Sequence, residues 1–89
     1  MEYTVYVLYS SKFDEIYIGY TSNLIQRFLA HNKLSKKGWS IKFRPWIVIH
    51  CEYFNSKIDA LNREKQLKSA FHRKWIREQI IPNFSDLPI

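Results

Sequence analysis

The hydrophobic and polar positions divide the chain into six segments, and the first two have the pattern of β-strands. Residues 3–9 are β-branched or aromatic almost throughout and show no helical stripe. Serine, lysine and aspartate supply turn chemistry over 10–14, and the strand pattern resumes over 15–19. Two strands joined by so short a turn predict a β-hairpin.

The next two segments have the patterns of a helix and a third strand. Residues 21–23 are all capable N-caps, and large apolar side chains then recur at helical spacing over 24–31. After a basic loop, proline at position 45 disfavours helix and releases the chain into the apolar run 46–53. We expect this run to be the most buried strand.

Two further helices complete the pattern. Ser56 with Asp59 three residues later resembles a capping box, and it opens a helix that we expect to run on to Phe71. A second helix begins near Ser69 or His72 and ends at Pro82. The order β-β-α-β-α-α predicts one α/β (α+β) domain over 1–81, followed by a tail over 82–89.

Composition supports a folded domain of one compact unit. The 89 residues are 46% hydrophobic and 17% aromatic, and the single cysteine excludes an internal disulfide. Cys/His clusters and the common nucleotide-binding loops are absent, so we expect no structural zinc and no small-molecule cofactor. Neither a membrane span nor a signal-peptide pattern occurs, and we expect a cytoplasmic protein without a membrane partner.

The net charge of +6 is concentrated in two blocks. Five basic residues and no acid lie between 33 and 44, and six basic residues with one acid lie between 61 and 77. Such blocks in an otherwise acidic chain indicate a polyanion, most commonly a nucleic acid, although a solvated basic surface would have the same pattern. The candidate phosphate contacts are Lys33, Lys36, Lys37, Lys42, Arg44, Lys65, Lys68, Arg73 and Lys74.

Glu64 is the one acid within the second basic block, and its spacing points it inward. It falls between Ala60 and Leu67 at intervals of four and three residues, and Phe71 continues the same face. A carboxylate on a buried face must be paired, bound to a metal or placed at the rim of a cleft. A structural ion pair with a lysine or arginine and a catalytic role both remain open.

Four other residues could form a site beside this carboxylate. Arg27 and His31 are four residues apart and lie one above the other at the edge of the first helix. A guanidinium there could hold a phosphate and an imidazole could move a proton, or the two could simply cover the helix surface and cap its last turn. Tyr6 and Tyr17 can approach each other across the hairpin, although tyrosines in strands most often serve packing.

These residues occur together in a recognisable order. Thr4-Val5-Tyr6 lies on a strand, Tyr17-Ile18-Gly19 follows, Arg27 and His31 share a helix, and Glu64 lies within the segment 60–68. The chain thereby resembles the GIY-YIG endonuclease superfamily over about residues 3–75, and especially its small stand-alone bacterial members.

The resemblance implies the GIY-YIG nuclease fold, a three-stranded antiparallel sheet flanked by helices, and cleavage of phosphodiester bonds in DNA. One divalent metal ion, Mg²⁺ or Mn²⁺, would be held by Glu64 together with waters and a phosphate oxygen. Tyr6 would activate or orient the attacking water with support from Tyr17, and His31 would take part in the proton transfer. Arg27 would stabilise the charge of the transition state. Gly19 would let the strand turn into the helix without blocking the cleft.

The chain departs from the family pattern at two places. Its first motif keeps only the tyrosine of Gly-Ile-Tyr, and residues 69–79 lack the asparagine that many members carry after the glutamate. Lys68 or Lys74 could replace that asparagine as a phosphate contact. We expect a metal-dependent DNA endonuclease of repair or recombination, and the alternative is a weak or inactive nucleic-acid-binding module of the same fold.

Overall fold

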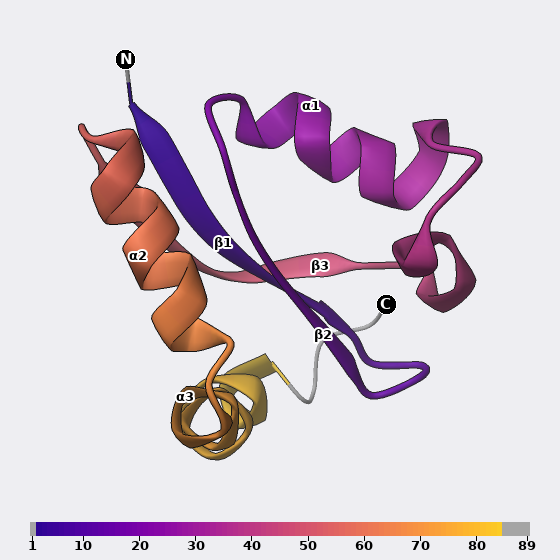
Figure 1. Cartoon of the computed structure of the whole chain (residues 1–89). Coiled ribbons are helices and arrows are strands. Elements are labelled where there is room, and N and C mark those ends of the chain that lie inside the picture. The colour runs from indigo at the N-terminus through magenta and orange to yellow at the C-terminus, as the bar shows by residue number, and fades with distance from the viewer. Residues whose placement is uncertain (1, 85–89) are drawn as a thin grey trace.

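A computed structural model describes residues 2–84 and contains one three-stranded antiparallel sheet (Figure 1). The strands are β1 (Tyr3–Ser10), β2 (Glu15–Thr21) and β3 (Ile47–Phe54), in the spatial order β2-β1-β3. Both pairings are antiparallel, so the predicted hairpin and the α+β class are confirmed.

The central strand is β1, and the expectation that the third strand is the most buried is wrong. Residues 5–10 of β1 are all buried, whereas Ile49 is the one buried residue of β3. The reason is topological, because β1 is hydrogen-bonded on both sides and covered on both faces while β3 forms an edge. Periodicity within a strand does not reveal its place in a sheet.

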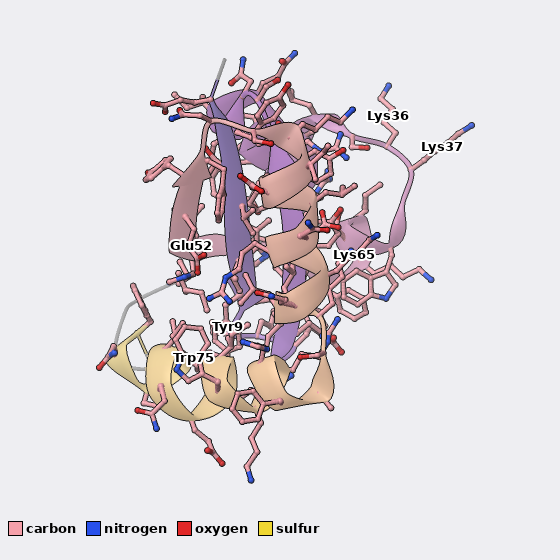
Figure 2. The ribbon with its side chains drawn as sticks, turned by 60° about the vertical axis from the view of Figure 1, so that its left-hand side comes forward. Tyr9, Lys36, Lys37, Glu52, Lys65 and Trp75 are labelled. Carbon is pink, nitrogen blue, oxygen red and sulfur yellow. The ribbon has the colours of Figure 1, made fainter. Side chains whose placement is uncertain are left out.

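The helical segments follow the predicted order. Helix α1 (Leu24–Leu29) is capped by Asn23, whose Oδ1 accepts from the Gln26 amide at 3.1 Å, and it continues as the π-helical turn η1 (Ala30–Leu34). A short 3₁₀ segment, η2 (Trp39–Phe43), follows it. Helix α2 (Lys57–Leu67) begins at the Ser56 cap. Figure 2 shows α2 standing against the sheet, with the C-terminal helical turns across its lower end.

The C-terminal region differs from the expectation in two respects. Helix α2 ends at Leu67, so Phe71 lies on α3 (Ala70–Trp75) and is 76% exposed instead of continuing the buried face. Pro82 does not end the helical region, because η3 (Ile76–Ile80) is followed by η4 (Ile81–Phe84), and Phe84 packs on the core. Residues 85–89 of the expected tail lie outside the described part.

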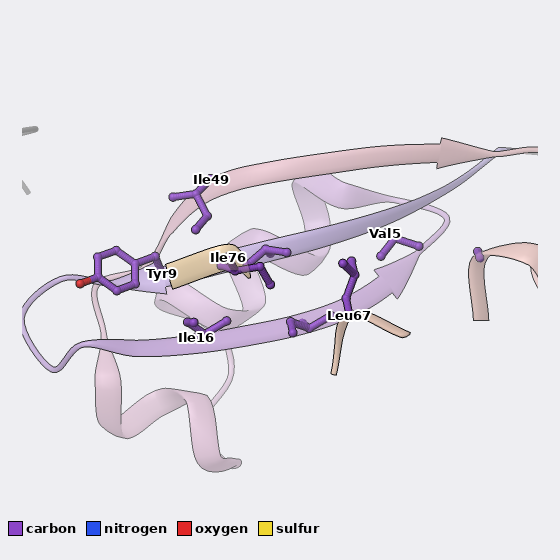
Figure 3. Close-up of a cluster of buried hydrophobic side chains, with 9 residues drawn as sticks. Val5, Tyr9, Ile16, Ile49, Leu67 and Ile76 are labelled. Atoms are coloured by element: carbon purple, nitrogen blue, oxygen red, sulfur yellow. The ribbon is translucent and has the colours of Figure 1, made fainter. Parts of the chain in front are cut away.

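Two cores occupy the two faces of the sheet because alternate side chains of β1 point in opposite directions. Val5, Val7 and Tyr9 pack with residues of α2 and η3, as Figure 3 shows for part of this cluster. Tyr6 and Leu8 point the other way and pack with Trp46 and with the inner side of α1. The second face therefore holds a buried tyrosine, and it is the face on which the predicted catalytic residues meet.

Gly19 lies opposite Tyr6 in the β1–β2 pairing, and the tyrosine side chain occupies the space above it. A Cβ on residue 19 would lie 2.6 Å from Tyr6 Oη and 2.8 Å from Tyr6 Cζ. The expected role at a strand-to-helix turn is wrong, since β2 continues to Thr21. Glycine is required here because a side chain would displace the tyrosine ring.

We therefore expect Gly19→Ala to destabilise the protein by about 1–3 kcal/mol, the usual effect of overpacking a close contact. Urea unfolding followed by circular dichroism measures this loss, and Ser22→Ala at an exposed position serves as the control. A Gly19→Ala midpoint equal to that of the control would contradict the close contact.

Candidate active site

Four of the predicted residues converge from four elements, β1, β2, α1 and η1. Tyr6 of β1 and Tyr17 of β2 stack with ring centroids 6.2 Å apart, and the His31 ring lies 4.3 Å from that of Tyr17. Tyr6 Oη is 3.1 Å from His31 Nε2. Arg27 lines the same cleft as Tyr17 and His31 and interacts with both tyrosine hydroxyls. The structure thus brings these four residues together.

The strand register explains why the two tyrosines meet. Leu8 is paired with Tyr17, and Tyr6, two residues earlier on the same face, is paired with Gly19. The tyrosines are therefore diagonal neighbours on one face, a separation that aromatic side chains bridge. Leu24 and Phe28 pack on this face and hold the helical segment that carries the arginine and the histidine.

Burial keeps both members of the hydrogen-bonded pair uncharged near neutral pH. Desolvation, and then the proximity of Tyr17, raises the pKa of Tyr6 to about 12, and the Arg27 guanidinium opposes this rise. Desolvation also lowers the pKa of His31, and the positive charges of Arg27 and Arg44 lower it further. A neutral imidazole therefore faces a neutral phenol, which allows the phenol to donate its proton to Nε2.

Ser40, which was not predicted, contacts the second ring nitrogen of His31. Its Oγ lies 2.8 Å from His31 Nδ1, and the residue is 8% exposed. Trp46 Nε1 donates to the Ser40 carbonyl at 2.9 Å, which fixes the serine backbone. A histidine that donates from Nδ1 to this hydroxyl presents its Nε2 lone pair to Tyr6. No spacing rule singles out a serine in a basic loop, so sequence reasoning had no signal for it.

Arg44, a predicted phosphate contact, donates its hydrogen bonds to backbone carbonyls of the protein. Its guanidinium donates to the carbonyl oxygens of His31, Ala30 and Ser35 at 2.6, 3.0 and 2.7 Å. Ala30 and His31 belong to η1 and Ser35 is its C-terminal cap residue, whose amide also donates to the Ala30 carbonyl at 3.0 Å. The structure thus gives Arg44 the role of a helix cap that ties the basic loop to the site.

Glu64 points inward as its spacing predicts. Its side chain is 14% exposed, and its Oε1 accepts from Lys68 Nζ at 3.3 Å within the same helix. Its negative charge contributes to the raised pKa of Tyr6, which places it within electrostatic range of the tyrosine. The ion pair and the proximity to the site are therefore both present.

Three clefts beside this cluster share lining residues and therefore adjoin one another. The central cleft, of about 320 Å³, is lined by Tyr17, Arg27, His31 and Trp39 among others. A second cleft of about 310 Å³ shares Tyr17 and Trp39 with it, and a third of about 350 Å³ shares Arg27. We call these three adjoining clefts together the site groove.

The predicted phosphate contacts divide according to this groove. Lys37 lines its central part, and Lys68 and Arg73 line the second cleft. Lys36 and Lys37 project from the loop after η1, and Lys65 lies on α2 (Figure 2). Five of the predicted phosphate contacts are exposed but line none of these three clefts: Lys33, Lys36, Lys42, Lys65 and Lys74. Lys74 is paired with Glu78 at 3.9 Å.

The sequence model of the GIY-YIG catalytic domain matches residues 2–77. The chain belongs to the GIY-YIG family. A UPF0213 protein of Staphylococcus haemolyticus is 31% identical over 73 residues, which cover 82% of this chain and 88% of the relative. A UPF0213 protein of Natronomonas pharaonis is 33% identical and covers 82% and 85%, respectively.

The fold has a counterpart among solved structures. The solution NMR structure of a UPF0213 protein of Bacillus halodurans superposes with a TM-score of 0.53 at 24% identity, covering 86% of this chain and 83% of that chain. Membership of the GIY-YIG family places the chain in a nuclease superfamily that binds nucleic acid. No helix within residues 2–84 is long and apolar enough to span a membrane.

GIY-YIG nucleases generally use a divalent metal ion. Residues 2–84 contain no group of three or more histidine, cysteine or acidic side chains able to hold a metal. Glu64 alone, a largely buried carboxylate near Tyr6, fits a Mg²⁺ ion that keeps its waters and takes further ligands from a substrate phosphate. A single carboxylate therefore fits a cation that takes its other ligands from water and substrate.

The depressed pKa of His31 predicts a pH dependence of stability. An unfolded histidine takes up a proton below about pH 6.5, whereas the folded protein resists doing so. The contribution of His31 to the free energy of unfolding is therefore fully present above that pH, and it is lost as the pH decreases below it. We expect the urea midpoint to drop between about pH 7 and 5 and His31→Gln to remove most of that drop.

The control for this measurement is His72→Gln, which changes a histidine on α3 outside the site groove. The lowered pKa values of Asp14 and Glu52 affect stability only at lower pH, where carboxylates titrate. If His72→Gln removed the drop and His31→Gln left it intact, the assignment of the uncharged state to His31 would be wrong.

Proposed function

We propose that this GIY-YIG protein is a metal-dependent endonuclease that hydrolyses phosphodiester bonds in DNA. The observation that carries the proposal is the 3.1 Å contact of Tyr6 Oη with a buried, uncharged His31, beside Arg27 in a basic groove. A structural tyrosine buried to this degree would also need a hydrogen-bond partner, but it would not need an arginine and an open cleft beside that partner. The preference for DNA rests on the resemblance to GIY-YIG endonucleases.

Tyr6 and His31 act as a proton relay for the attacking water. With a pKa of about 12 the phenol is not a base by itself at neutral pH, so it accepts the water proton while passing its own proton to His31 Nε2. Ser40 holds the imidazole in the required orientation through Nδ1. The raised pKa of Tyr6 thereby becomes compatible with a role in base catalysis.

Arg27 supplies the positive charge for the phosphate. Its hydrogen bonding to Tyr6 raises the already high pKa of the guanidinium, so it remains a cation throughout the reaction. It lines the cleft that holds Tyr17 and His31, where a scissile phosphate would lie within reach of the relay. A guanidinium at that point stabilises the extra negative charge of the pentacoordinate transition state.

Glu64 is the residue that would hold the divalent cation. A bound Mg²⁺ or Mn²⁺ would supply charge stabilisation at the phosphate oxygens. The competing ion pair is weak, since the Lys68 side chain is about half exposed and 3.3 Å from the carboxylate. Lys68 is therefore free to turn toward a phosphate when the carboxylate takes a cation, which would give it the contact role of the missing asparagine.

Glu64→Gln keeps the shape of the side chain and removes its charge. We expect DNA cleavage to be lost and DNA binding to persist, while the free energy of unfolding changes by about 0.5 kcal/mol or less because the partner of this i,i+4 pair, Lys68, is about half exposed. Cleavage of a plasmid with Mg²⁺, DNA binding in chelator and urea unfolding measure the three quantities.

Glu78→Gln is the matched control, because it also removes a glutamate from an i,i+4 pair with lysine but lies outside the site groove. It should cleave like the unmodified protein. Cleavage by Glu64→Gln at the rate of this control would refute the metal-ligand assignment. Binding without cleavage in the unmodified protein would favour the inactive nucleic-acid-binding module.

Arg27→Ala separates transition-state stabilisation from ordinary phosphate binding. We expect the single-turnover rate to fall by about 10²–10³-fold, as when one preorganised charge-stabilising donor is removed from an active site. The dissociation constant for DNA should change only a few-fold, since the groove keeps its lysines. Lys57→Ala is the control, because it removes an exposed positive charge that lines none of the three clefts. Equal losses in rate and in binding would reduce Arg27 to a binding residue.

A further inference from the structure

Trp39 is one of the large exposed aromatic residues that belong to neither core, and it is the tryptophan among them. It opens η2 and is 46% exposed, whereas Trp46, seven residues later, is 1% exposed and belongs to the core. Trp39 lines both the central and the second cleft, so it stands where these two parts of the site groove join. About half of the indole is therefore open to a ligand, and covering it would stabilise the complex.

The ring is held in place by its neighbours. Its centroid lies 4.6 Å from that of Phe43 and 6.0 Å from that of Trp46. Tyr17 lies 6.5 Å away in a nearly parallel orientation, with an interplanar angle of 27°. The next residue, Ser40, is anchored by Trp46 and His31. The exposed indole is therefore presented on a fixed support, and little side-chain freedom would be lost when a ligand packs on it.

The charges around the indole suit a phosphate chain that passes on both sides of it. Lys37 lines the central cleft on one side, and Lys68 and Arg73 line the second cleft on the other. Glu15 is the one acid that lines these two clefts. Basic residues that flank an exposed aromatic side chain form the arrangement by which proteins bind unpaired nucleotides, with the backbone on the cations and a base on the ring.

We propose that Trp39 is a stacking platform for an unpaired base next to the scissile phosphate, so that the substrate is a strand unpaired at the point of cleavage. This inference rests on the proposed nuclease function. A base inside a duplex already has both faces covered by its neighbours and cannot reach the indole without leaving the stack. Stacking also places the strand beside Tyr17, which packs against Tyr6 and His31.

The test measures binding in the Glu64→Gln background with chelator, so that cleavage plays no part. Three labelled probes of equal charge are compared: an oligo-dT strand, an abasic strand of the same length and a closed hairpin duplex. We expect oligo-dT to bind about tenfold more tightly than the abasic strand, because one stacked base contributes on this scale. Trp39→Leu should reduce oligo-dT binding to the abasic level, whereas Trp39→Tyr should retain most of the difference.

Phe71→Leu is the matched control, since Phe71 is also an exposed aromatic residue beside basic side chains but lies on α3 outside the site groove. It should leave the preference for oligo-dT intact. Intrinsic fluorescence gives a second reading without a Trp39 substitution: in Trp75→Phe, oligo-dT should quench the remaining exposed indole and the abasic strand should not.

Equal binding of oligo-dT and the abasic strand, or an unchanged preference in Trp39→Leu, would overturn the platform. The outcome is independent of catalysis, because a protein that cuts duplex and single strands equally would keep the nuclease function and lose the platform. A protein that stacks oligo-dT on Trp39 but cuts no DNA would keep the platform and lose the nuclease function. Failure to bind any of the three probes would contradict both.

Discussion

The contact of the Tyr6 ring with the bare backbone of Gly19 is the constraint on which the site depends. Because residue 19 has no side chain, the phenol can lie flat across β2 and direct its hydroxyl toward α1 and η1. The hydroxyl is almost fully buried there, and a buried phenol must have a hydrogen-bond partner. His31 supplies that partner, and the same contact joins the sheet to the helix that carries Arg27.

A second set of interactions fixes the segment between η1 and β3, which would otherwise be a mobile basic loop. Arg44 ties it to the end of η1, and Asn32 pairs with the Trp46 backbone in both directions, at 2.9 and 2.6 Å. Within that frame Ser40 meets His31 and Trp39 is held at the surface. These polar side chains therefore fix the segment that lines the central cleft.

The two faces of the sheet have different physical characters. The face toward α2 and η3 is filled mainly by aliphatic side chains, and it provides the hydrophobic stabilisation that a chain of this length requires. The other face buries a phenol and an imidazole, which raises one pKa and lowers the other. Such burial stabilises the fold less than aliphatic packing would, but it leaves two neutral groups joined by a hydrogen bond beside the site groove.

Local patterns in the sequence determined the elements and much of the candidate site. The hairpin, the Ser56 cap, the pairing of the two tyrosines and the shared face of Arg27 and His31 all follow from spacings of a few residues. The inward direction of Glu64 follows from its spacing to Ala60 and Leu67 in the same way. Short-range periodicity suffices for these features because the backbone geometry of a helix or strand fixes where each side chain points.

Tertiary structure alone decided the features that join distant segments. It placed β1 in the centre of the sheet, turned Arg44 onto the carbonyls of η1 and brought Ser40 to His31. It also ended α2 at Leu67, which exposed Phe71 although both lie on one extrapolated helical face. These outcomes depend on which surfaces pack together and which buried polar groups need partners, and neither condition is encoded in the period of a single segment.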